Sequence, residues 1–218
     1  MPPLPTPICP SLPAGALTLL PLLPEHAEAM ALWLTDPQVY TYLDDTPLTS
    51  VDVLRERYTR WQTRVSPEGD QLWLNWVVRL DSPGGVARGG VDDGADIDPA
   101  PPCPLVGAIV GPLIGHMQAT VLANGQAWLA WVFAPAHWGR GHARAATRAM
   151  LAHLVAAHGV HTGLASVEVA NTRSVALLLA LGFRQSDARG SSPTERLYVG
   201  DLAPAGSGAA SASGSTNR

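Results

Sequence analysis

Two glycines that flank an arginine, Gly139 and Gly141, come just before a helix-like run, and this pattern suits the binding of an anion. Glycine lets the backbone turn tightly with its N–H groups pointing inward, and a helix start carries unpaired N–H groups that attract phosphate. Arginines recur at positions 140, 144 and 148, at the helix end whose partial positive charge opposes cations. A bound polyphosphate would attract both the arginines and the helix start and so offset their mutual repulsion. The stretch therefore predicts a phosphate site. The alternative is a glycine turn followed by a solvated arginine face.

Other phosphate-binding motifs match this stretch poorly. The dinucleotide fingerprint needs a third glycine or alanine at its own spacing, and Ala143 does not have that spacing. The P-loop needs a lysine, but all 14 basic residues of the 218-residue chain are arginines. The same composition excludes a catalytic lysine.

The stretch from Trp138 to Ala143 instead resembles the phosphate motif of the GNAT superfamily of acyl-CoA N-acyltransferases, Gln/Arg-x-x-Gly-x-Gly/Ala. Trp138 replaces the Gln or Arg, a variant found in the branch that includes the RimJ and RimL ribosomal-protein N-acetyltransferases. The segment DPQVYTYL is typical of the same branch, and the resemblance covers roughly residues 17–202 apart from an interruption. A second family signature, Asn-x-x-Ser followed by a short helix and Leu-Gly-Phe, is matched by Asn171, Ser174, Leu181, Gly182 and Phe183.

The resemblance implies that acetyl-CoA is the co-substrate and that no metal takes part. Its pyrophosphate would lie on the backbone N–H groups of the glycine turn, and its pantetheine arm along the preceding strand and against Asn171. A strand N–H would polarise the thioester carbonyl. The implied cofactor-binding residues are Trp131, Val132, Phe133, Trp138, Gly139, Arg140, Gly141, His142, Ala143, Arg144, Asn171 and Ser174.

Many members of the family use a strand glutamate and a helix tyrosine in catalysis, and this chain has Trp128 and Leu178 at those positions. The resemblance makes Ser174 the candidate that protonates or stabilises the departing thiolate. Glu168 is the candidate base, directly or through water. As alternatives, Glu168 is a solvent-facing strand residue, and Asn171 with Ser174 simply begins a helix.

Three further residues are candidates for contact with the acceptor: Tyr40, Tyr42 and His116. The tyrosines equally suit packing under the following helix. His116 and His137 are further candidates for the base, although a lone histidine is more often structural than catalytic. The remaining histidines predict no metal site, because they share no helical face and no cysteine or acid joins them.

These residues need a framework of mixed helices and strands to position them. The resemblance implies an α+β fold of the three-layer GNAT-like form, with helices on both faces of a mixed, mostly antiparallel central sheet. A V-shaped splay would separate the fourth and fifth strands. The sequence itself predicts a helix from about Gly141 to His158, closed by Gly159, and helix N-caps at Ser50 and Asn171.

One domain is expected over residues 16–202, preceded by a flexible segment at 1–15. Residues 81–104 combine many glycines, prolines and aspartates, which favours a flexible insertion over a functional lid. The low-complexity residues 203–218 predict a disordered tail.

Composition and charge exclude other classes of protein. With a net charge of -4, the chain is not expected to bind nucleic acid or an anionic membrane. Cys9 and Cys103 lie beside prolines in loop-like segments, so we expect no disulfide framework and a cytoplasmic compartment.

The sequence therefore predicts an N-acetyltransferase, monomer or homodimer, that moves the acetyl group of acetyl-CoA by direct attack of a primary amine. The acceptor would be a small-molecule amine or a protein N-terminus. The alternatives are a non-catalytic acyl-CoA-binding or sensor module and, with a poorer motif match, a nucleotide-binding protein.

Overall fold

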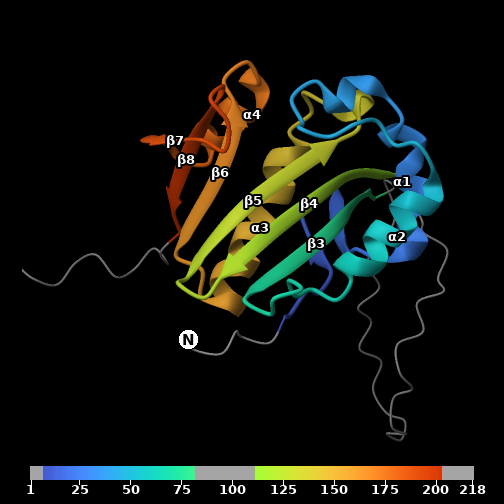
Figure 1. Ribbon diagram of the computed structural model, residues 1–218, viewed down its shortest axis with the longest axis horizontal. Coiled ribbons are helices and arrows are strands. Elements are labelled where there is room, and N and C mark those ends of the chain that lie inside the picture. Colours follow the sequence, from blue (N-terminus) through green and yellow to red (C-terminus); the bar gives the residue numbers. More distant parts are fainter. Residues whose placement is uncertain (1–6, 82–110, 203–218) are drawn as a thin grey trace, which may run out of the picture.

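The computed structural model describes residues 7–81 and 111–202, and within them eight strands form one sheet in the order β1-β2-β3-β4-β5-β6-β8-β7 (Figure 1). The expected tail at 203–218 and nearly all of the expected insertion at 81–104 lie outside the described residues. The strands are β1 (Leu12–Pro13), β2 (Leu17–Pro21), β3 (Gln71–Leu80), β4 (Leu113–Leu122), β5 (Gln126–Phe133), β6 (Thr162–Glu168), β7 (Arg184–Arg189) and β8 (Glu195–Asp201). The helices are α1 (Ala27–Leu34), α2 (Val51–Trp61), α3 (His142–His158) and α4 (Thr172–Ala180), with 3-10 turns η1 (Pro24–His26), η2 (Pro37–Tyr40) and η3 (Pro135–His137).

The sheet is antiparallel except where β5 meets β6. These two strands pair in parallel from Gln126 with Thr162 to Trp128 with Leu164, and then diverge (Figure 1). This confirms the predicted V-shaped splay. It falls between the fifth and sixth strands because the two-residue β1 comes before the strand that we expected to be first.

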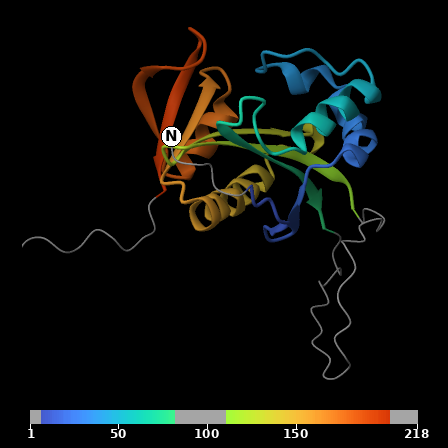
Figure 2. The ribbon, with the colours of Figure 1, turned by 60° about the horizontal axis from the view of Figure 1, so that its bottom comes forward.

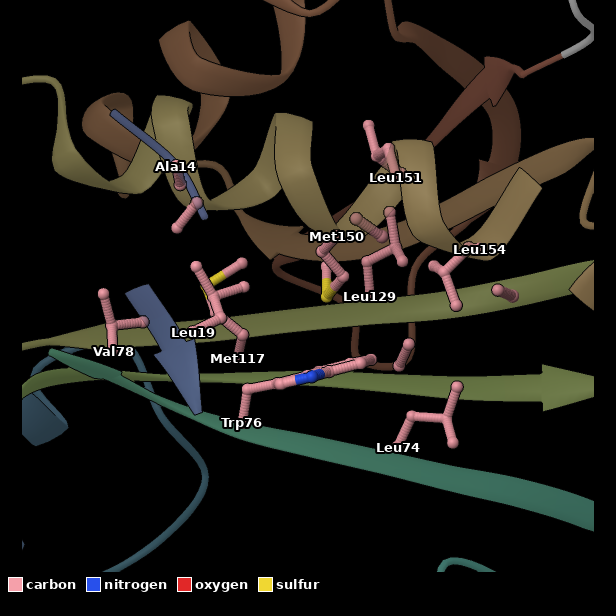
Figure 3. Close-up of a cluster of buried hydrophobic side chains, with 14 of the residues drawn as sticks. Ala14, Leu19, Leu74, Trp76, Val78, Met117, Leu129, Met150, Leu151 and Leu154 are labelled. Carbon is pink, nitrogen blue, oxygen red and sulfur yellow. The ribbon is translucent and has the colours of Figure 1, made fainter. Parts of the chain in front are cut away.

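Helices cover both faces of the sheet, as predicted, with α3 on one face and the α1–α2 pair on the other (Figure 2). On the α3 face, Met150 and Leu154 of the helix pack over Trp76, Met117 and Leu129 of the strands (Figure 3). A smaller cluster fills the other face, and its buried members are Leu22, Ala27, Met30, Ala31, Leu54, Tyr58, Val77 and Leu113.

The caps that the sequence predicted are present. Oγ of Ser50 accepts a hydrogen bond from the N–H of Val53 at 3.2 Å, which starts α2. Helix α3 ends at His158, and Gly159 follows it in the left-handed conformation with φ +63°.

The N-terminal residues pack more closely than the sequence indicated. We expected residues 1–15 to be flexible, but in the described part β1 pairs with β2, and Cys9 is buried. The carbonyl of Ile8 accepts hydrogen bonds from Nε2 of His153 and of His158, each at 2.9 Å. This segment is therefore held against the end of α3, because its apolar side chains complete the core and its backbone finds partners there.

Candidate active site

The end of β5 has backbone groups with no strand partner. The N–H of Ala134, just after β5, donates to the carbonyl of Ile114 in β4 at 2.9 Å. Because an antiparallel ladder alternates, Val132 also turns its N–H and carbonyl towards β4, whereas those of Trp131 and Phe133 point towards β6. The pairing of β5 with β6 has already ended there. An extended ligand can therefore bind along this edge as an added strand would.

The turn from β5 into α3 brings backbone N–H groups to a helix start. Gly141 is the N-cap of α3 with φ +79°, and Gly139 has φ +72°. Both values lie in the left-handed region that disfavours side chains. No side chain caps the start of α3, so its first N–H groups are free to bind an anion.

Arginines gather around this turn without acidic partners. Arg140 and Arg144 line the cavity at the turn, and Arg173 of α4 lines it as well. Within the described residues, none of the three forms an ion pair. Arg148 is exposed and is not part of the cavity lining. Three guanidinium groups without counter-charges make the cavity suited to an anion that carries several charges.

Trp138 connects the turn to both of its neighbours. Its Nε1–H donates to the carbonyl of Phe133 at 2.7 Å, and the guanidinium of Arg173 lies 4.8 Å from its ring centre. The first contact fixes the turn to the end of β5, and the second is a cation–π contact with α4. The resemblance named Trp138 as a cofactor-binding residue, but the sequence did not predict either of these contacts.

Two histidines flank the turn and line the same cavity. The ring centres of His137 and His142 lie 5.8 Å apart, and Nδ1 of each is buried with no hydrogen-bond partner among residues 7–81 and 111–202. Burial lowers the pKa of both rings, and the positive charge of Arg140 lowers each pKa further. An anion bound at the turn would act in the opposite direction, because it favours the protonated imidazole.

Helix α4 supplies the second wall of the cavity. Oδ1 of Asn171 accepts a hydrogen bond from the N–H of Ser174 at 3.1 Å, so Asn171 caps this helix as the sequence predicted. Both residues line the cavity. Among the described residues, the hydroxyl of Ser174 and Nδ2 of Asn171 have no partner, which leaves both able to bind a ligand.

The position of α4 depends on Phe183, which follows the helix. Its ring lies over Gly163 of β6 and Gly200 of β8, which face each other in the sheet. A Cβ atom at Gly163 would lie 2.8 Å from this ring, and one at Gly200 would lie 2.7 Å from it. These contacts are too short for a side chain, so the ring fits here only because both residues are glycines.

The loop, the end of β5 and α4 enclose a cavity of about 430 Å³. Every cofactor-binding residue predicted from the sequence lines it, from Trp131 on β5 to Ser174 on α4, and so does Tyr42 of the acceptor candidates. The sequence reasoning missed the contribution of Arg173, of Gln38 in η2 and of Leu43 after η2. The DPQVYTYL segment was the available signal for η2.

Three predicted site residues lie outside the cavity lining. Glu168 is at the end of β6, where its Oε1 accepts a hydrogen bond from Oγ1 of Thr194 at 2.6 Å. Tyr40 donates its hydroxyl proton to the carbonyl of Leu34, the last residue of α1, at 2.8 Å. His116 is on β4, on the sheet face that α2 covers.

Within residues 7–81 and 111–202, no group of three or more histidines, cysteines or carboxylates could bind a metal ion. None of the helices in these ranges is both long enough and apolar enough to cross a membrane.

A family model described as an acetyltransferase (GNAT) domain matches residues 16–184. The chain belongs to the GNAT acetyltransferase family. A comparison with curated proteins gives no match. The two positions that lack the usual GNAT catalytic groups differ in their surroundings, because Trp128 is 37% exposed and Leu178 is fully buried.

Solved GNAT structures share this fold at low sequence identity. RimJ of Mycobacterium smegmatis, in complex with CoA-disulfide, is 20% identical over 90% of this chain and 88% of that one, with a TM-score of 0.63. A ribosomal-protein-S5-alanine acetyltransferase of Vibrio fischeri is 12% identical over 89% of this chain and 97% of that one, with a TM-score of 0.63. Spermidine N-acetyltransferase of Vibrio cholerae, in complex with CoA and spermine, is 17% identical over 84% of this chain and 93% of that one, with a TM-score of 0.57.

Proposed function

We propose that the protein acetylates a primary amine, of a small molecule or of a protein N-terminus, by its direct attack on acetyl-CoA. One observation carries the proposal. In the part of the chain that the structure describes, an edge of β5 without a strand partner, a start of α3 without a side-chain cap and three arginines without ion pairs all meet at one cavity. Such a cavity suits a ligand that has an extended amide-bearing arm at one end and a diphosphate at the other.

The residues present fit acetyl-CoA. The N–H groups of residues 139–144, with Arg140 and Arg144, would hold the diphosphate. The edge of β5 at Trp131 and Phe133, together with Nδ2 of Asn171, would hold the pantetheine amides. The bound coenzyme supplies an acetyl group activated as a thioester.

The same elements support transfer of the acetyl group. An N–H on the β5 edge can stabilise the negative charge that develops on the carbonyl oxygen during attack. The hydroxyl of Ser174 has no partner among the described residues and can donate to the departing sulfur. No carboxylate is among the described residues that line the cavity, and Glu168 is engaged by Thr194. This favours acceptors that lose a proton readily, such as an α-amino group with a pKa of about 8 rather than a lysine near 10.4.

A panel of amines tests the proposal. The purified protein is given acetyl-CoA with peptides of varied N-terminal residue, polyamines and amino acids, and release of free thiol is followed. Peptide N-termini and polyamines head the panel because the structural relatives include a ribosomal-protein-S5-alanine acetyltransferase and a spermidine N-acetyltransferase. We expect turnover with at least one class of amine.

The lack of a carboxylate in the described lining also favours a second candidate function, a non-catalytic acyl-CoA sensor. Tight binding of acetyl-CoA without turnover over the whole panel would select this second function. Binding of NAD in place of CoA would contradict both.

A further inference from the structure

His116 lies one strand away from the edge where the acetyl group would be bound. It stands directly opposite Val132 in the β4–β5 register, and residues in such a pair point to the same face of a sheet. Val132 lines the cavity. The ring of His116 stacks on that of Trp61 of α2, with centres 5.4 Å apart and planes 3° from parallel. His116 therefore lies beside the splay on the face opposite α3.

A chain of hydrogen bonds fixes the tautomer of His116. Nδ2 of Asn75 donates to the carbonyl of Trp73 at 3.2 Å, and a flipped amide would set two oxygens against each other there. Oδ1 of Asn75 therefore faces Nε2 of His116, at 3.2 Å. An amide oxygen only accepts hydrogen bonds, so the proton is on Nε2 and the lone pair is on Nδ1. Asn75 is only 3% exposed, which protects this arrangement from water.

The lone pair of His116 is free at neutral pH. Burial, together with the positive charge of Arg57, lowers the pKa of His116 to about 4. Arg57 lies over the ring of Trp61, 5.9 Å from its centre, and pairs with Asp45 at 3.1 Å. Among the described residues Nδ1 has no hydrogen-bond partner, and the side chain is partly exposed. His116 thus presents an unused proton acceptor beside the splay.

We propose that Nδ1 of His116 accepts a hydrogen bond from the acceptor amine and receives its proton as the amide bond forms. This inference rests on the proposed function. The amine lone pair bonds to the acetyl carbon, the C–S bond breaks with its electron pair on sulfur, and the amine proton passes to Nδ1. The imidazolium then gives a proton to solvent and the thiolate takes one up, which yields the amide and free CoA. The surroundings that keep His116 neutral also disfavour an ammonium ion, so the acceptor binds as the neutral amine that can attack.

His116→Phe keeps a ring to stack on Trp61 and removes both nitrogens. We expect kcat to fall on the order of 100-fold. The affinity for acetyl-CoA and the melting temperature at pH 8 should stay near their wild-type values, because the ring stack is kept and His116 is outside the cavity lining. A kcat within threefold of wild type would overturn the role of His116 and leave the proposed function in place. A wild-type protein that acetylates no amine would instead remove both.

Two measurements separate this role from a structural one. In the free wild-type protein, imidazole ¹⁵N spectra at pH 7 should show the proton of His116 on Nε2, and a proton on Nδ1 would overturn the proposal without any assay of activity.

Asn75→Asp places a carboxylate against Nε2, which favours the imidazolium and raises the pKa of His116. The pH profile of kcat/KM should then show an additional loss of activity below the raised pKa, beyond the fall that protonation of the free amine causes in both proteins. An unchanged profile in a folded variant with a raised pKa would contradict the proposal. If Asn75→Asp does not fold, the ¹⁵N spectra of wild type and the kcat of His116→Phe test the proposal instead.

Discussion

The indole N–H of Trp138 donates to the carbonyl of Phe133 at 2.7 Å, and this contact fixes the glycine turn before α3 to the strand that would hold the pantetheine arm. The bond spans η3, which lies between the two residues. It also occupies a carbonyl on the side of β5 that has no strand partner. The two halves of the proposed coenzyme site are thus set relative to each other before any ligand arrives.

Trp138→Phe keeps an aromatic ring under Arg173 and removes only this donor. A single hydrogen bond contributes about 1 kcal/mol, so we expect the affinity for CoA to fall about fivefold. Calorimetric titration with CoA measures the change. Arg173→Met is the companion variant, because it removes the cation–π contact and leaves the hydrogen bond. Equal affinities of Trp138→Phe and wild type would show that the bond does not organise the site.

Gly141→Asp should abolish detectable binding of CoA. The substitution puts a carboxylate where the diphosphate would lie and forces a side chain into the left-handed conformation, so a loss of on the order of 100-fold or more in affinity is expected. Gly159→Asp is the matched control, since Gly159 has φ +63° and nothing within 4 Å of a built Cβ, as at Gly141, but lies at the other end of α3. Gly141→Asn introduces a side chain of similar size without the charge, so comparing its CoA affinity with that of Gly141→Asp separates backbone strain from electrostatic repulsion. Retained CoA binding in Gly141→Asp would argue against a diphosphate at this turn.

Ser174→Ala should lower turnover far more than affinity. If the hydroxyl serves the departing sulfur, kcat should fall about 10- to 100-fold while the dissociation constant of acetyl-CoA changes little. Steady-state kinetics and calorimetry on the same preparation separate the two effects. Thr172→Ala provides the control, because Thr172 is on the same helix but exposed and outside the cavity lining. A variant with the kcat of wild type would remove Ser174 from the mechanism.

Acid should destabilise the fold through three histidines, of which His26 and His158 are buried and His116 is partly buried. Burial is the main cause that lowers the pKa of His26, His116 and His158. The folded-state pKa lies below the unfolded value of about 6.5, so the unfolded chain binds more protons as the pH falls, and stability is lost from about pH 6.5 downward. With its folded pKa at about 4, His116 alone should contribute a loss of about 2 kcal/mol between pH 7 and pH 5.

Urea unfolding at pH 7, 6 and 5 measures this loss. The free energy of unfolding of His116→Phe should depend less on pH than that of wild type, because the variant has no titrating ring at this position. Curves that run parallel for the two proteins would contradict the low pKa of His116.

The sequence predicted those parts of the site that depend on neighbours along the chain. Gly139 and Gly141 adopt the left-handed turn, and Asn171 caps α4 through Ser174, because each pattern acts over only a few residues. The splay was also predicted correctly, but through the family resemblance, since no local pattern encodes where two strands part.

Contacts between distant residues could not be predicted in this way. The environment of His116 is made by Trp61 on α2 and Asn75 on β3, and only the register of β3 with β4 and the packing of α2 on the sheet bring them together. The proline-rich residues before β1 looked loose because prolines suit loops, yet His153 and His158 bind the carbonyl of Ile8 from 145 and 150 residues away.

The position of α4, which forms one wall of the cavity, depends on two residues that have no side chain, Gly163 and Gly200. Gly163 and Gly200 stand opposite each other outside the cavity lining, and the ring of Phe183 occupies the volume that their methyl groups would fill. Adding even an alanine at either position would push that ring, and the helix it follows, outward from the sheet. The spacing between α4 and β5 therefore depends on two glycines that do not line the cavity themselves.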